Sequence, residues 1–136
     1  MTRNSINIGI VGSRSRNSED DFVKVEQAFC KLVAEIFGKG VNELYEEVYI
    51  VSGGAKEGAD RFAPLLSTKY SFPLITYPPN MALSYNKCFF FRNAIIAQKC
   101  NYLIACIDKE SSTAGALSTL NRFKEVVKDE KFWRVV

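Results

Sequence analysis

The stretch Ser52-Gly-Gly-Ala-Lys-Glu-Gly-Ala-Asp60 has the composition and spacing of an anion-binding turn. An apolar run over residues 48–51 leads into it, and a helical pattern over residues 60–66 leads out. Glycines at such a junction permit a positive φ and let a ligand approach the backbone closely. The N-terminus of the next helix adds unpaired N–H groups and a partial positive charge, so a phosphate would fit there. The plainer reading, in which the glycines serve only a strand–turn–helix joint, stays open at this point.

Similar residue types follow the other predicted strands. They are Gly12, Ser13 and Arg14 after the first strand, Lys87, Arg92 and Asn93 after the third, and Thr113 and Gly115 after the fourth. Because the carboxyl ends of parallel strands share one edge of a sheet, that edge would gather cations, glycines, hydroxyl groups and helix N-termini. The opposite edge offers the acidic stretch 38–47. This asymmetry predicts an anion site that suits several phosphate groups, although Thr113 could also serve only as a helix N-cap.

The arginines of this edge have plainer readings as well. Arg14 and Arg16 could be solvated loop residues. Arg92 interrupts an apolar helix and therefore calls for a partner. That partner could be a ligand phosphate, or a structural carboxylate such as Asp60 or Asp108.

Strands and helices alternate along the chain, which predicts the α/β class with a mostly parallel sheet of about five strands flanked by helices. The predicted strands cover residues 6–11, 48–52, 73–77, 102–107 and 132–136, and the helices begin near residues 18, 60, 88 and 113, with a polar loop over 80–87. Ser18 and Asp21 resemble a capping box in which Asp replaces the usual Glu or Gln. Pro64, inside the second helix, predicts a kink or a late start of that helix.

Composition narrows the function classes. The 136 residues fit a single domain, 1–136, with a real core. The absence of histidine removes Ser-His-Asp and Cys-His nucleophiles and the common zinc sites, so we predict neither a metal nor a cofactor. The formal charge of +3 is too small to argue nucleic-acid binding by itself. No apolar run approaches the roughly 20 residues of a membrane span, and no signal peptide is recognisable, so we expect a cytoplasmic protein with reduced thiols.

Four motifs follow one another along nearly the whole chain. They are Gly12-Ser-Arg14, the glycine stretch 52–60, Asn86-Lys87 ahead of Arg92-Asn93, and Thr113-Ala-Gly115 with Thr119. This set resembles the YspA-like branch of the SLOG superfamily, and the glycine motif is its specific part. Lys56 and Glu57 stand where that motif usually has one residue. The resemblance implies a Rossmann-like domain that binds a nucleotide or a nucleotide-derived ligand.

With the resemblance, the predicted ligand-binding residues are Gly12, Ser13, Arg14, Gly53, Gly54, Ala55, Asp60, Lys87, Arg92, Asn93, Thr113, Gly115 and Thr119. The related LONELY GUY phosphoribohydrolases carry a P-G-G-x-G-T-x-x-E motif at the start of their last helix. Here Ala116 replaces the motif threonine, and Thr119 occupies the position of the glutamate. Any replacement acid would have to come from Asp60, Asp108 or Glu110.

Three functions remain open on the sequence. The first is a cytoplasmic binding domain for a nucleotide or nucleotide derivative, acting as a sensor or accessory protein. The second is an enzyme that cleaves the N-glycosidic bond of nucleoside monophosphates, and the third is an accessory protein for single-stranded DNA. The predicted helix 88–97 is apolar around more of its circumference than one core face needs, with Phe89, Phe90 and Phe91 in a row. We therefore expect a homodimer through this helix, unless the loop 80–87 and the last helix cover it.

Overall fold

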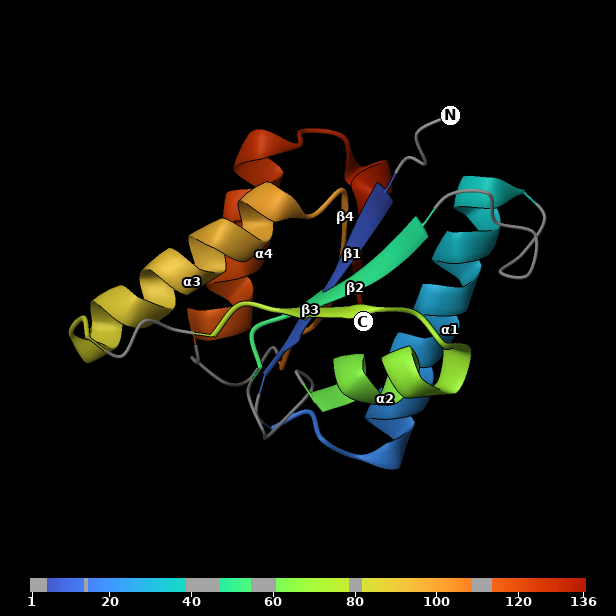
Figure 1. The fold of residues 1–136 in the computed structure, drawn as a ribbon, viewed down its shortest axis with the longest axis horizontal. Coiled ribbons are helices and arrows are strands. Elements are labelled where there is room, and N and C mark those ends of the chain that lie inside the picture. Colours follow the sequence, from blue (N-terminus) through green and yellow to red (C-terminus); the bar gives the residue numbers. More distant parts are fainter. Residues whose placement is uncertain (1–4, 14, 39–46, 55–60, 79–81, 109–113) are drawn as a thin grey trace.

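A parallel sheet forms the centre of the computed structural model, which describes residues 5–13, 15–38, 47–54, 61–78, 82–108 and 114–136 (Figure 1). Its five strands are β1 (Ser5–Gly12), β2 (Glu47–Ser52), β3 (Leu74–Thr76), β4 (Tyr102–Cys106) and β5 (Trp133–Val135). They lie in the order β3-β2-β1-β4-β5, and every neighbouring pair is parallel. The predicted α/β class and parallel sheet are confirmed, and the arrangement is Rossmann-like.

Two pairs of helices cover the two faces of this sheet. The helices within the described ranges are α1 (Glu19–Phe37), α2 (Phe62–Tyr70), α3 (Tyr85–Lys99) and α4 (Ala114–Val126), and a 3-10 turn, η3, covers Glu130–Phe132. Figure 1 shows α1 and α2 on one side of the sheet and α3 and α4 on the other. The strand order reverses between β1 and β4, so the connections that follow these two strands leave toward opposite faces. In open sheets, ligands bind at the carboxyl ends of the two strands where the order reverses.

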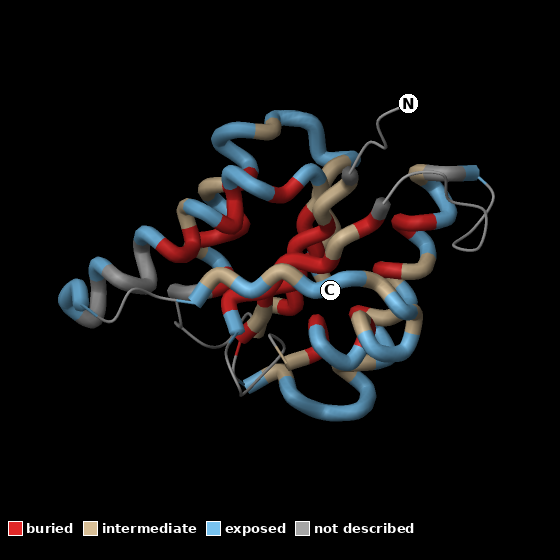
Figure 2. The backbone as a smooth tube through the Cα atoms, viewed as in Figure 1, coloured by how far each residue is buried: buried red, intermediate tan, exposed pale blue. Residues whose placement is uncertain are grey.

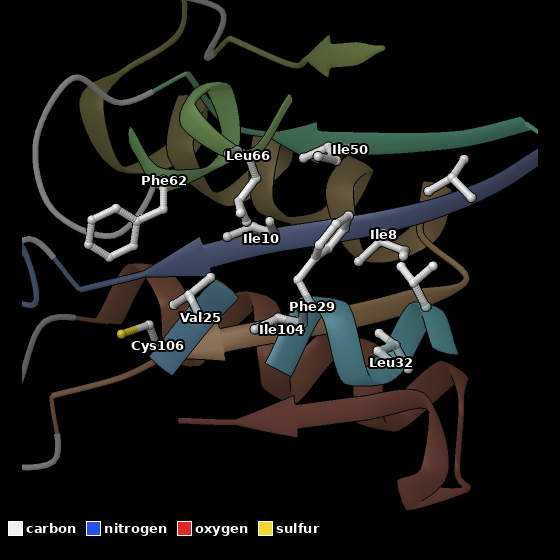
Figure 3. Packing of buried hydrophobic residues seen from close by; sticks show 13 residues of the cluster. Ile8, Ile10, Val25, Phe29, Leu32, Ile50, Phe62, Leu66, Ile104 and Cys106 are labelled. Atoms are coloured by element: carbon white, nitrogen blue, oxygen red, sulfur yellow. The ribbon is translucent and has the colours of Figure 1, made fainter. Parts of the chain in front are cut away.

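Each face of the sheet has its own apolar cluster, and Figure 2 shows buried residues along the middle of the sheet. Residues alternate between the faces along a strand, so Ile8 and Ile10 join the cluster under α1 and α2, while Val11 joins the cluster under α3 and α4. In Figure 3, Phe29 of α1 and Leu66 of α2 point toward β1. Burial on both faces explains why the inner strands are almost continuously apolar in sequence.

The helix ends follow the signals in the sequence, with one exception. The Ser18 hydroxyl accepts from the Asp21 N–H and the Asp21 carboxylate accepts from the Ser18 N–H, which confirms the capping box. Helix α2 begins at Phe62, so Pro64 falls in the first turn, where its missing N–H costs no helical hydrogen bond; the predicted late start is confirmed. The predicted loop over 80–87 is wrong at its end, because α3 already begins at Tyr85. The apolar pattern starts only at Cys88, so this first turn gave no periodic signal.

Among the described helices, none combines the length and the apolar character of a membrane span.

Candidate functional site

The turn after β2 has the geometry that a glycine pair predicts. Gly54 has a φ of +79°, which an L-residue with a side chain rarely adopts. A Cβ atom at Gly54 would also lie 2.7 Å from Cγ2 of Thr76 on the neighbouring strand. The Ser52 hydroxyl accepts a hydrogen bond of 3.1 Å from the Gly54 N–H, which fixes the turn from within. Gly54 itself is exposed.

Gly53 is required for another reason. Its φ lies outside the left-handed region, so its conformation does not demand glycine. A Cβ atom there would lie 2.1 Å from Nη1 and 2.8 Å from Cζ of Arg92. The absence of a side chain at Gly53 is therefore what allows the guanidinium of Arg92 to lie directly on the backbone of the turn.

Arg92 belongs to α3, which packs on the face of the sheet opposite α1 and α2, and its side chain reaches the turn after β2. Its Nη1 donates to the Gly53 carbonyl at 2.9 Å, and its Nε donates to the Asn93 side-chain oxygen at 2.8 Å. Both side chains are buried, with exposed fractions of 9% for Arg92 and 5% for Asn93. A cation is rarely buried unless its hydrogen bonds are made, and here those bonds hold it at the carboxyl edge of β2. Of the two structural carboxylates considered for Arg92, Asp60 lies outside the described residues.

A second group of polar residues ties together the ends of β1 and β4. The Ser13 N–H continues the ladder to the Cys106 carbonyl at 2.9 Å, and the buried Ser13 hydroxyl accepts from the Asp108 N–H at 3.0 Å. The Ser15 hydroxyl donates to Oδ2 of Asp108 at 2.6 Å. These bonds place half-buried Asp108 just beyond the ends of β1 and β4, where the strand order reverses.

Two other cations near this edge have structural roles. Arg16 donates to Oδ1 of Asp21 at 2.6 Å, to the Ile107 carbonyl at 2.8 Å and to the backbone oxygen of Val136 at 3.0 Å. The hydrogen bond to Asp21 is the main cause that raises the pKa of Arg16 above its ordinary value. Arg61 donates from Nε to the Asn17 side-chain oxygen. Arg16 is thus neither a ligand residue in this arrangement nor a merely solvated one, because it joins the start of α1 to the ends of β4 and β5.

Some of the remaining predicted residues lie on α3 and α4, and the others lie outside the described residues. Thr119 is buried on α4 with an exposed fraction of 1%, and Gly115 belongs to the first turn of the same helix. Lys87 is exposed in the first turn of α3, the part of that helix that projects farthest from the sheet in Figure 1. The structure brings Gly53, Arg92 and Asn93 together, whereas Lys87 lies on α3 more than one helical turn before Arg92. The other predicted residues lie outside the described part of the chain: Arg14, Ala55, Asp60 and Thr113.

Several polar or charged side chains of the described residues are buried. They are Ser13, Ser52, Arg92, Asn93 and Thr119, which come from the ends of β1 and β2 and from helices α3 and α4. Ser52 and Ser15 were not among the predicted site residues. Their only sequence signals are that Ser52 directly precedes the glycine pair and that Ser15 follows Ser13 by two positions.

Two of the described cysteines, Cys100 and Cys106, are buried. Burial raises the pKa of Cys106, at the end of β4, to about 11, and that of Cys100 to about 12. Both thiols therefore stay protonated at neutral pH and are poor nucleophiles. In the ranges that the structure describes, no group of three or more His, Cys, Asp or Glu side chains is placed to hold a metal ion. At this edge the buried guanidinium of Arg92 lies on the glycine turn after β2, and the carboxylate of Asp108 follows β4, two strands away.

Comparison with models of known protein families and with curated proteins found no match to this chain. Its function must therefore be inferred from its own residues and their geometry.

Proposed function

We propose that this chain is a nucleotide-binding domain of the SLOG superfamily, YspA-like branch, which acts in the cytoplasm as a sensor or accessory protein. The observation that carries this proposal is the buried guanidinium of Arg92, held on the Gly53 carbonyl at the carboxyl edge of β2. A phosphate is the ligand group that best matches a fixed guanidinium beside a glycine turn.

The arrangement supports this ligand class in two ways. The inner side of the glycine turn is braced by Arg92 and Ser52, while Gly54 on its outer side is exposed. The described start of the turn is therefore held by hydrogen bonds, and a site that is held in place loses less entropy when it binds. The turn also lies one strand away from the point where the strand order reverses, which is where open α/β sheets bind their ligands.

A thermal-shift series tests the proposal. The probes are the 5′-mono- and diphosphates of adenosine and guanosine, ADP-ribose, and inorganic phosphate as the reference anion. A nucleotide that binds the native state raises the midpoint of unfolding as its concentration increases. We expect at least one nucleotide to do so well beyond the effect of phosphate alone. If every probe gives the shift of phosphate or none, the chain is not a nucleotide-binding domain.

The second candidate is hydrolysis of the N-glycosidic bond in nucleoside monophosphates. The observation that favours it is the Asp108 carboxylate, which the Ser15 hydroxyl and the strand ends hold at the same edge. A carboxylate can act as a general acid or base. The phosphoribohydrolase glutamate has no counterpart on α4, because Thr119 stands at that position and is buried. Incubation with AMP and GMP, followed by assay for free adenine or guanine, separates hydrolysis from binding alone.

We further propose that the protein forms a homodimer through α3. Phe91 and Ile95 lie four residues apart on this helix, with exposed fractions of 50% and 40%. Figure 1 shows the N-terminal part of α3 extending beyond the sheet. A second copy of the helix would bury the exposed part of both side chains.

A further inference from the structure

Arg92 is anchored through two of its nitrogen atoms by groups from different parts of the chain. Nη1 donates to the Gly53 carbonyl on the turn after β2 at 2.9 Å, and Nε donates to Oδ1 of Asn93, the next residue of α3, at 2.8 Å. A guanidinium is planar, so bonds from two of its nitrogens fix both its place and the rotation of its plane. Gly53 and Asn93 together therefore set the orientation of the cation at this edge of the sheet.

The bond between Arg92 and Asn93 is not one that a helix supplies by itself. Successive residues of an α-helix point about 100° apart around the axis, so their side chains do not face one another. The Arg92 side chain must therefore bend across α3 to reach Oδ1 of Asn93, whose own side chain is buried. An arginine side chain has many rotamers, and an acceptor that holds its Nε excludes most of them. Asn93 thus restricts Arg92 to the conformation that brings the guanidinium to the glycine turn.

The two acceptors named here are both neutral. The backbone carbonyl of Gly53 and the amide oxygen of Asn93 accept hydrogen bonds without carrying a formal charge. A carboxylate at position 93 could accept the same bond, but its negative charge would oppose the attraction between the guanidinium and a phosphate. An amide at this position therefore orients the cation without cancelling its charge.

We infer that Asn93 is a positioning residue that holds Arg92 in place for a phosphate, and that the Arg92–Asn93 pair gives this site its preference for phosphorylated over unphosphorylated nucleosides. The inference rests on the proposed nucleotide binding and adds to it the pair of residues that recognises the phosphate. Asn93 acts through Arg92, so its effect on the ligand should largely vanish when the arginine is absent.

Calorimetric titration with AMP, GMP, adenosine and guanosine tests the inference, because the ratio of nucleotide to nucleoside affinity isolates the contribution of the phosphate. The wild type should bind each nucleotide about tenfold or more tightly than its nucleoside, the range for a hydrogen bond to a charged group. Asn93→Leu, which has a similar size but no acceptor, should remove most of this preference. In an Arg92→Lys background the same substitution should change the ratio little, since lysine has no Nε–H donor. Asn121→Leu, at an exposed position of α4, is the matched control and should keep the wild-type ratio.

Asn93→Asp is a second variant that separates position from charge. It keeps an acceptor beside Nε, so the protein should fold, but its carboxylate should lower the ratio of nucleotide to nucleoside affinity severalfold. A wild-type ratio in this variant would overturn the inference. This variant decides the matter if Asn93→Leu does not fold, or if Arg92→Lys alone has already lost the whole preference.

The outcomes separate this inference from the function on which it rests. Equal affinity of the wild type for nucleotides and nucleosides would overturn the phosphate contact and leave binding of the nucleoside part intact. An equal fall of the ratio with and without Arg92 would give Asn93 a role independent of the arginine and overturn the inference. Failure of all four probes to bind would remove the inference together with the proposed function. The thermal unfolding of each apo variant reports its folding.

Discussion

Gly54 must be glycine because its φ is +79°, whereas Gly53 must be glycine because the guanidinium of Arg92 occupies the space that a side chain would need. Two adjacent positions that look equivalent in the sequence should therefore respond differently to alanine. Gly54→Ala forces a side chain into the left-handed region and against Thr76, so it should lower the free energy of unfolding by about 1–2 kcal/mol. Gly53→Ala can be relieved if the long side chain of Arg92 swings away, so it should cost less stability.

For ligand affinity we expect the opposite order, with a larger loss in Gly53→Ala than in Gly54→Ala. Gly53→Ala displaces the guanidinium that we propose as the phosphate partner, and it should weaken nucleotide binding strongly while the protein stays folded. Denaturant unfolding and calorimetric titration of both variants check the prediction. Undiminished affinity in a folded Gly53→Ala protein would show that Arg92 does not need its place on the turn.

Arg92 itself offers the direct test of the anion site. Arg92→Ala should weaken nucleotide binding by about 1.5–3 kcal/mol, the range for a hydrogen bond to a charged group. Arg92→Lys keeps the charge but loses the planar fork, so it should recover only part of the affinity. Arg122→Ala, on α4, is the control for removing an arginine from the same helical layer. A variant that loses several kcal/mol of stability yet binds normally would make Arg92 only a brace for the turn.

Helix α1 is fixed at its start by the Ser18–Asp21 capping box and by the bond from Arg16 to Asp21. Partial burial works to raise the pKa of Asp21, but the hydrogen bonds from Arg16 and Ser18 together lower it below its ordinary value of 3.8. A lowered pKa in the folded state means that the carboxylate stabilises the fold at neutral pH. This contribution is lost as the pH falls below about 4 and through the lowered pKa of the folded state.

The pH dependence of stability should therefore be smaller in Asp21→Asn, which keeps the capping geometry but removes the charge. The variant should be less stable than the wild type at pH 7, by about 1–3 kcal/mol for the lost charged hydrogen bond. The difference should shrink toward pH 3. Urea unfolding at several pH values measures it, with Glu125→Gln as the control for loss of an exposed acid. A difference that stays constant with pH would contradict the assigned ion pair.

At the scale of elements, the sequence predicted what depends on local rules. Apolar periodicity located the strands and helices, Ser18 marked the start of α1, and Pro64 indicated the late start of α2. The first turn of α3 was missed because the polar residues at its start do not show the apolar spacing by which a helix is recognised. The contacts of Arg16 and Arg61 could not be foreseen either, because their partners come from loops that only the folded chain brings together.

For the whole molecule, alternation of strands and helices predicted a parallel sheet but not its strand order. That order depends on which apolar strands pair across long stretches of sequence, as β1 does with both β2 and β4. The order determines that β1 lies between the strand followed by Gly53 and the strand followed by Asp108. The sequence could name the residues of a polar edge, but only the fold shows which strand ends lie next to one another there.

The exposed side chains of α3 give a prediction at the same scale. Phe91 and Ile95 form an apolar pair on the outer surface of the helix, and we propose that two copies bury these pairs against one another around a two-fold axis. Each dimer would then hide two Phe91 rings, each contributing about 1 kcal/mol because half of the ring is already buried in the monomer, and a carboxylate in its place would add a cost of desolvation. Phe91→Glu should therefore raise the dissociation constant by roughly 100-fold or more and yield folded monomers.

Sedimentation velocity over a wide range of protein concentrations measures this change. Val23→Glu is the matched control, because Val23 is exposed to 44% on α1, on the opposite face of the sheet. That variant should sediment as the wild type does, since its charge is placed outside the proposed interface. If the wild type remains a monomer at every concentration, α3 is not a dimer interface. If Val23→Glu also yields monomers, added charge in general, and not the loss of the Phe91 contact, would explain the dissociation.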